Sequence, residues 1–109
     1  MLKVGHSESF WYPVTVKILD ENGNEVPYEF KARFRRLPRE ELLAKIQNMK
    51  DLELMRENLI GWSGVVDESE NPLPFTEENK DLVFSLWPVL PTMARTFVEA
   101  QAPEARAKN

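Results

Sequence analysis

The residues of this chain that could do chemistry are few, and their spacing assembles no familiar catalytic group. The single histidine, His6, lies in a polar stretch, and the chain contains no cysteine. Nucleophilic catalysis needs a nucleophile, a base and an orienting group within hydrogen-bond reach of one another. No partner for His6 can be assigned, so we expect an exposed histidine without a catalytic role.

The stretch GWSGVVDESENPLPFTEEN, residues 61–79, is the most site-like part of the sequence. Its two early glycines lack the longer motif and the preceding strand of a phosphate-binding loop. Its carboxylates Asp67, Glu68 and Glu70 could bind a divalent cation, but they lack the pattern of a calcium loop. A solvated acidic turn is the favoured interpretation. We therefore expect no enzyme, no metal site and no cofactor.

Charge is unevenly spread along a chain whose formal net charge is −4. Cations gather in one stretch, at Lys31, Arg33, Arg35, Arg36 and Arg39. Carboxylates gather in another, at Asp67, Glu68, Glu70, Glu77, Glu78 and Asp81. Such asymmetry is more typical of solubility and pairing than of nucleic-acid binding. The basic stretch has two interpretations: the solvent side of an edge strand, where charges discourage unwanted pairing, or a docking face for an acidic partner.

Strict alternation of apolar and polar residues predicts an antiparallel β-hairpin over about 10–35. A two-residue turn would place the apolar sides of the two strands on opposite faces. A three-residue turn, 21–23, pairs Ile18 with Val26 and gives both strands a common apolar face. It also puts Gly23 at the position of a type I turn with bulge that needs left-handed backbone.

Helical spacing of apolar residues follows over 39–60. The sequence leaves open whether this segment is one bent helix or two, with Asn48 and Asp51 as candidate break points. Gly61 is a candidate C-terminal cap for it. This helical segment is expected to cover the aromatic face of the hairpin, since a lone hairpin is only marginally stable in water.

Thr76 is predicted to cap the next helix, whose apolar face would be formed by Leu82, Val83 and Leu86. Pro88 and Pro91 interrupt that helix, and a last short helix is expected from about Thr92. The sequence thus predicts one α+β domain over 1–101, in which the hairpin packs against a bundle of three to four helices. Residues 102–109 are expected to form a flexible tail.

Several large apolar residues exceed what a core of this size is expected to bury. Trp11 falls on the polar face of the first strand, and Trp87 precedes a proline. Exposed apolar groups mark interaction surfaces, and methionine suits variable partners. A protein-binding surface is therefore predicted at Met49, Met55, Trp87, Met93 and Phe97, although each of the five would also suit the core.

The order of these parts resembles that of the small tail assembly chaperones of long-tailed bacteriophages. In that group a Trp, small residues, Val and acidic residues lead through Pro-Leu-Pro-Phe into a helix, a proline-marked break and a final helix. The match covers roughly residues 10–101 and is most specific between 60 and 100. It is carried by Gly61, Trp62, Val65, Asp67, Pro72, Leu73, Phe75, Thr76 and Phe97.

The resemblance implies a non-enzymatic phage or prophage protein of the host cytoplasm. Such chaperones bind the tape measure protein, keep it soluble and recruit tail tube subunits during tail morphogenesis. They leave before the tail is complete, so we expect no copy in the mature virion. The surplus apolar surface leaves a homo-oligomer open, whereas a membrane or nucleic-acid partner is not expected.

Two alternatives remain for the function. One is a structural connector protein of the phage tail or neck, which would stay in the particle. The other is a small adaptor that binds nucleic acid through the basic strand face, which includes Lys31, Arg33 and Arg35.

Overall fold

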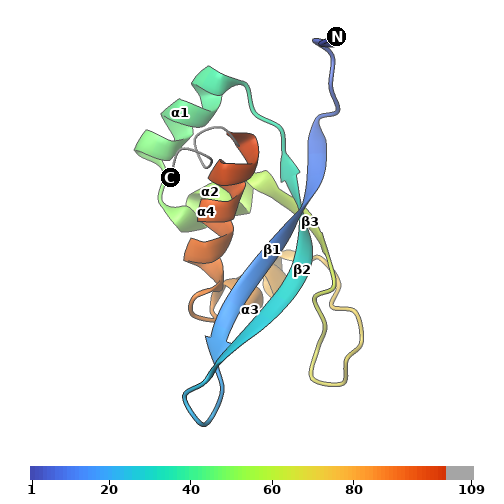
Figure 1. Cartoon of the computed structure of the whole chain (residues 1–109), viewed down its shortest axis with the longest axis vertical. Helices are drawn as coiled ribbons and strands as arrows, with labels where there is room; N and C mark the ends of the chain where they lie inside the picture. Colours follow the sequence, from blue (N-terminus) through green and yellow to red (C-terminus); the bar gives the residue numbers. More distant parts are fainter. Residues whose placement is uncertain (103–109) are drawn as a thin grey trace.

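The computed structural model describes residues 1–102. Over these residues the chain forms an antiparallel three-stranded sheet of order β1-β2-β3 and four helices (Figure 1). The elements, in chain order, are β1 (Ser9–Leu19), β2 (Glu25–Arg35), α1 (Arg39–Asn48), α2 (Asp51–Asn58), β3 (Leu59–Ser63), α3 (Glu77–Phe84) and α4 (Val89–Gln101). The predicted α+β class, a hairpin packed against helices, is confirmed. The tail predicted at 102–109 lies outside the described residues, except for Ala102.

The hairpin has the predicted register, with Ile18 opposite Val26. Its turn is closed by Asp20, whose backbone N–H donates to the carbonyl of Asn24 at 2.9 Å. Gly23 has a φ of 82°, in the left-handed region that a residue without Cβ adopts without strain. The three-residue turn is therefore confirmed.

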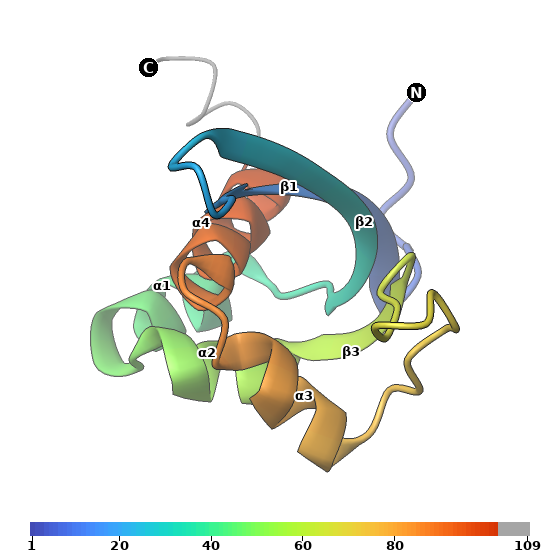
Figure 2. The ribbon, with the colours of Figure 1, turned by 90° about the horizontal axis from the view of Figure 1, so that it is seen from below.

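The common apolar face of the hairpin packs against the helices. Figure 2 shows α4 lying within the curve of the two long strands. The ring of Phe34, on β2, meets the ring of Phe97, on α4, edge-on with centroids 5.2 Å apart. The residues of this face that are buried are Val14, Val16, Ala32 and Phe34. Toward the turn the helices no longer cover the face, and Tyr28 is half exposed.

The helical segment predicted over 39–60 is two helices, which separate at Met49 and Lys50, both in extended conformation. The prediction that Gly61 caps this segment is wrong. Helix α2 ends at Asn58, and the chain passes directly into β3, where Gly61 lies opposite Arg33. A Cβ at Gly61 would lie 3.4 Å from the Cβ of Arg33, so glycine leaves room for that side chain.

The third strand also corrects the interpretation of the basic stretch as part of an edge strand. Because β3 pairs with it, β2 is the central strand of the sheet, with Lys31 opposite Ser63. Its cations therefore lie on the open face of the sheet and do not protect a free edge from pairing.

Thr76 caps α3 as predicted, since its Oγ1 accepts a hydrogen bond from the backbone N–H of Asn79 at 3.1 Å. The predicted apolar face of α3 is only partly right. Val83 is buried, but Leu82 and Leu86 are exposed. The helix is rotated so that the side chains of Lys80 and Phe84 face inward in place of Leu82, whereas Leu86 lies beyond the end of α3.

The last helix begins earlier than predicted, at Val89 and not near Thr92. Pro91 is the third residue of α4, in the first turn. The N–H groups of a first turn have no partner within the helix, so proline removes no hydrogen bond there. Pro91 therefore lies within α4 and does not mark a break before it.

Candidate binding groove

The two ends of the loop between β3 and α3 are held together by aromatic side chains. Trp62 and Phe75 meet edge-on, with ring centroids 4.8 Å apart. The indole Nε1–H of Trp62 donates to the carbonyl of Leu73 at 2.8 Å. Both rings also pack against the core. The loop therefore has a fixed base on the body of the molecule.

The outer part of this loop is a tight acidic turn. Val66 and Pro72 form a bridge across it. At its tip, the Oδ1 of Asp67 accepts hydrogen bonds from the backbone N–H groups of Ser69 and Asn71 at 2.9 and 3.0 Å. Within residues 1–102 no group of three or more His, Cys, Asp or Glu side chains is placed to hold a metal ion. Within the acidic run, Asp67 orders the turn by accepting hydrogen bonds from its backbone.

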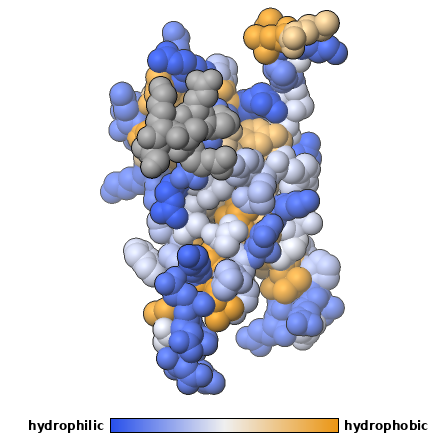
Figure 3. All heavy atoms as spheres, viewed as in Figure 1, coloured by the Kyte–Doolittle hydropathy of each residue, from blue (hydrophilic) through white to orange (hydrophobic). Residues whose placement is uncertain are grey.

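An open apolar groove of about 630 Å³ lies between this loop, the turn end of the hairpin and α3. Figure 3 shows apolar surface in the corresponding lower half of the molecule, beside the polar tip of the hairpin. The hairpin contributes Val16, Ile18, Tyr28, Glu29 and Phe30, the loop contributes Gly64, Val65, Val66, Asp67, Glu68 and Leu73, and the helical side contributes Leu82, Val83, Leu86 and Val89.

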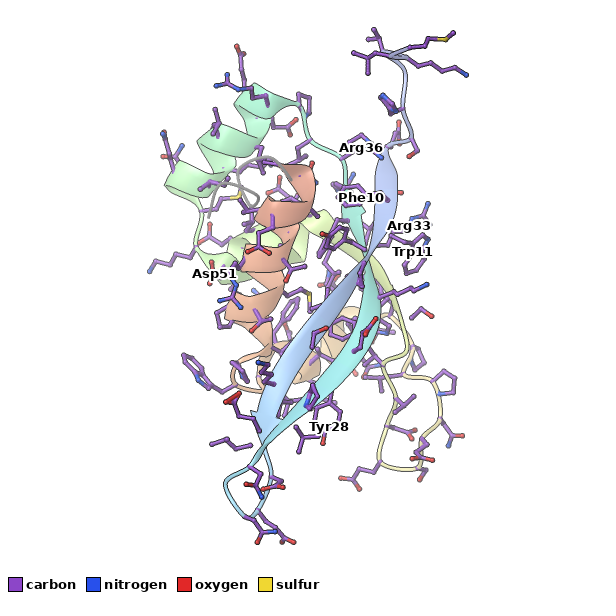
Figure 4. The ribbon with its side chains drawn as sticks, in the orientation of Figure 1. Phe10, Trp11, Tyr28, Arg33, Arg36 and Asp51 are labelled. Atoms are coloured by element: carbon purple, nitrogen blue, oxygen red, sulfur yellow. The ribbon has the colours of Figure 1, made fainter. Side chains whose placement is uncertain are left out.

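The rim of the groove is formed by large apolar side chains that remain in water. Their exposed fractions are 54% for Tyr28, 50% for Val66, 59% for Leu82 and 53% for Leu86. Trp87, which directly follows Leu86, is 85% exposed. Figure 4 shows Tyr28 near the turn end of the hairpin. A contiguous apolar rim of this kind is typical of a surface that binds a partner.

The residues predicted as a protein-binding surface do not lie together on the outside. Met55, Met93 and Phe97 are fully buried in the core, so they offer no surface to a partner in this fold. Met49 is partly buried and lines a smaller groove of about 210 Å³ beside α4. Only Trp87 is exposed next to the apolar groove. The surface is therefore reassigned to the groove.

Three of the nine residues that carry the family resemblance line this groove. Val65, Asp67 and Leu73 line it, while Trp62 and Phe75 fix the base of the same loop. The remaining motif residues are structural: Gly61 lies in β3, Pro72 bridges Val66, Thr76 caps α3, and Phe97 is buried in the core.

Sequence reasoning missed the groove because it assigned Tyr28, Leu82 and Leu86 to core-facing sides. Each of them has the periodicity of a buried residue. Exposure depends on where the helices stop covering the sheet and on the rotation of α3, for which the sequence contains no local signal.

A second exposed feature lies on the open face of the sheet, away from the helices. The guanidinium of Arg33 lies 5.9 Å from the centre of the Trp11 ring, and its Nε donates to Ser9 Oγ at 2.9 Å. Figure 4 shows Trp11 and Arg33 side by side, pointing away from the helices. Lys31 is exposed on the same strand. His6 is also exposed, in the segment before β1.

In comparisons with known proteins, the chain matches no family model, no curated protein and no solved structure. None of the helices described in residues 1–102 has the length and apolar character needed to cross a membrane.

Proposed function

We propose that this protein is a non-enzymatic tail assembly chaperone of a long-tailed phage or prophage. It binds apolar helical stretches of the tape measure protein in the groove, keeps them soluble and recruits tail tube subunits. The observation that carries the proposal is the open groove with four half-exposed apolar side chains on its rim. The proposed site of action is the host cytoplasm, and the mature virion lacks the protein.

The groove suits this role because an amphipathic helix can lay its apolar side into an apolar channel. Burying apolar surface contributes roughly 25 cal/mol per Å² to the free energy of association. A client that covers the exposed rim therefore binds more favourably than one that leaves it in water. A single short contact of this kind is weak. Many copies along one long client nevertheless bind it firmly through multivalency.

The proposal is tested by co-expressing the full chain with helical fragments of the tape measure protein from the same phage. We expect the fragments to stay soluble and to co-purify with the chain, and the chain to be missing from purified virions. Leu82→Ser with Leu86→Ser should abolish the effect. The matched control is Leu2→Ser with Leu43→Ser, because these exposed leucines do not line the groove.

Two results would contradict the proposal. If the fragments precipitate equally in the presence and absence of the chain, the chaperone function is contradicted. Stable incorporation of the chain into purified virions would favour the structural connector of the tail or neck.

The open face of the sheet supports a second candidate, an adaptor that binds single-stranded nucleic acid. The supporting observation is the half-exposed Trp11 beside Arg33, since bases stack on aromatic rings next to cations. This candidate requires micromolar binding of a single-stranded oligonucleotide that weakens as salt rises and is lost in Trp11→Ala. If no such binding is measured at low salt, the adaptor is excluded.

A further inference from the structure

The charged residues that line the apolar groove are all of one sign. They are Glu29 from the hairpin and Asp67 and Glu68 from the loop, and the lining contains no lysine, arginine or histidine. The carboxylates at the channel come from the loop, because the alternation of β2 places the Glu29 side chain on the opposite face of the strand from Tyr28 and Phe30. A partner that enters the channel brings its own charges close to these groups.

These carboxylates are not neutralised by the chain itself. The ion pairs formed within residues 1–102 join Lys45 to Glu41 and Glu57, Arg56 to Asp81, and Lys80 to Glu77. None of them involves Glu29, Asp67 or Glu68. Asp67 gives one carboxylate oxygen to the backbone of its own turn, but Glu29 and Glu68 are exposed. Negative charge thus remains at the border of the groove.

The shape of the groove favours an extended occupant over a small molecule. A site for a small ligand encloses most of the ligand surface. Here the apolar residues Tyr28, Val66, Leu82 and Leu86 form a rim that stays about half exposed, so an occupant must reach across the groove to cover it. An α-helix, with a diameter of roughly 10–12 Å including side chains, can cover such a rim along one side.

We propose that the groove selects amphipathic helices whose apolar stripe is flanked by lysine or arginine. The apolar stripe fills the channel, and the flanking cations pair with the loop carboxylates Asp67 and Glu68. This inference rests on the proposed function and names the chemistry of the client segments: among the helices of a long client, those with cationic borders bind first. A helix with acidic borders is repelled by the same carboxylates.

The test uses the full chain and two synthetic helical peptides with the same apolar stripe. One peptide carries lysine at the flanking positions, and the other carries glutamate. Affinities are measured by fluorescence anisotropy at low and high salt. We expect the lysine peptide to bind roughly five- to tenfold more tightly at low salt, because exposed ion pairs contribute modestly. The preference should shrink at high salt, where such pairs are screened.

Two pairs of substitutions locate the effect. Asp67→Asn with Glu68→Gln should remove the preference while both peptides still bind. Glu40→Gln with Glu53→Gln changes the net charge by the same amount on exposed residues outside the groove, and it should leave the preference intact. Leu82→Ser with Leu86→Ser should lower the binding affinity of both peptides by a similar factor.

The outcomes separate this inference from the proposed function. Equal binding of both peptides that still depends on Leu82 and Leu86 would overturn the charge selection and leave the chaperone groove in place. Binding that ignores the leucine substitutions would overturn both. Self-association of the free chain that depends on Leu82 and Leu86 and excludes both peptides would identify a second copy as the occupant, and so would overturn the inference.

Discussion

Two aspartates far apart in the sequence order their turns in the same way. The Oδ1 of Asp20 accepts hydrogen bonds from the backbone N–H groups two and four residues later, at Asn22 and Asn24. The Oδ1 of Asp67 does the same for Ser69 and Asn71. A short carboxylate satisfies donors that a turn would otherwise leave to water. In the loop, this arrangement shapes the wall of the groove.

At Asp67 we predict that Asp67→Ala lowers the free energy of unfolding by about 1 kcal/mol, because two backbone donors lose their acceptor. Asp67→Asn should lower it by less, since the amide oxygen can accept the same bonds. The measurement is urea denaturation followed by circular dichroism. Glu68→Ala is the control and should change stability by less than about 0.5 kcal/mol. An equal loss in the alanine and asparagine variants would contradict this role.

Helix α3 combines a structural side with a side that remains available to a partner. The inner side carries Lys80, whose Nζ donates to the carbonyl of Arg56 at 3.3 Å and to a carboxylate oxygen of Glu77 at 3.0 Å. The same ammonium lies 5.1 Å from the centre of the Phe75 ring. The Lys80 stem is thus buried with its charge satisfied. Because the Lys80 side of α3 faces the core, Leu82 faces the groove.

The N-cap of α3 gives a prediction for the helix as a unit. Thr76→Ala should destabilise the protein by about 1 kcal/mol, because the N–H of Asn79 loses its acceptor, whereas Thr76→Ser should be nearly neutral. Denaturant unfolding measures the change, and hydrogen exchange of α3 amides should accelerate in the alanine variant first. Unchanged exchange in α3 would show that the cap does not hold this helix.

The whole molecule is organised around α4, which lies within the curve of the hairpin and contacts both β1 and α2. Its buried residues belong to the same apolar cluster as those of the sheet. At this scale the molecule has a closed core at its centre and an uncovered apolar groove toward the turn end of the hairpin. Stability and binding therefore depend on different residues.

This division can be measured with two large-to-small substitutions. Phe97→Ala should lower the free energy of unfolding by about 3–5 kcal/mol, because it opens a cavity in the core. Trp87→Ala should change it by less than about 0.5 kcal/mol, because that side chain is exposed. Both values come from urea denaturation, with far-ultraviolet circular dichroism as the probe. Similar losses in the two variants would mean that Trp87 is part of the core.

The features that could be predicted are those decided by near neighbours in the chain. Alternation and one glycine identified the hairpin register, and a threonine before two glutamates identified the start of α3. Trp62 and Phe75 were singled out as motif residues, but the meeting of their rings at the two ends of the loop depends on the folded chain. The strand β3 was missed, because Leu59–Ser63 lacks the alternation of a strand and pairs only when the hairpin is present.

The amino-acid sequence determined the two-strand register, the turns and the helix start, since these depend on contacts between residues a few positions apart. Only the tertiary structure decided which apolar residues are covered. Met55, Met93 and Phe97 fill the core, whereas Tyr28, Leu82 and Leu86 border the groove, although all six have the periodicity of buried residues. The physical reason is that the helices are too few and too short to cover the whole hairpin, and coverage is a property of the assembled surfaces.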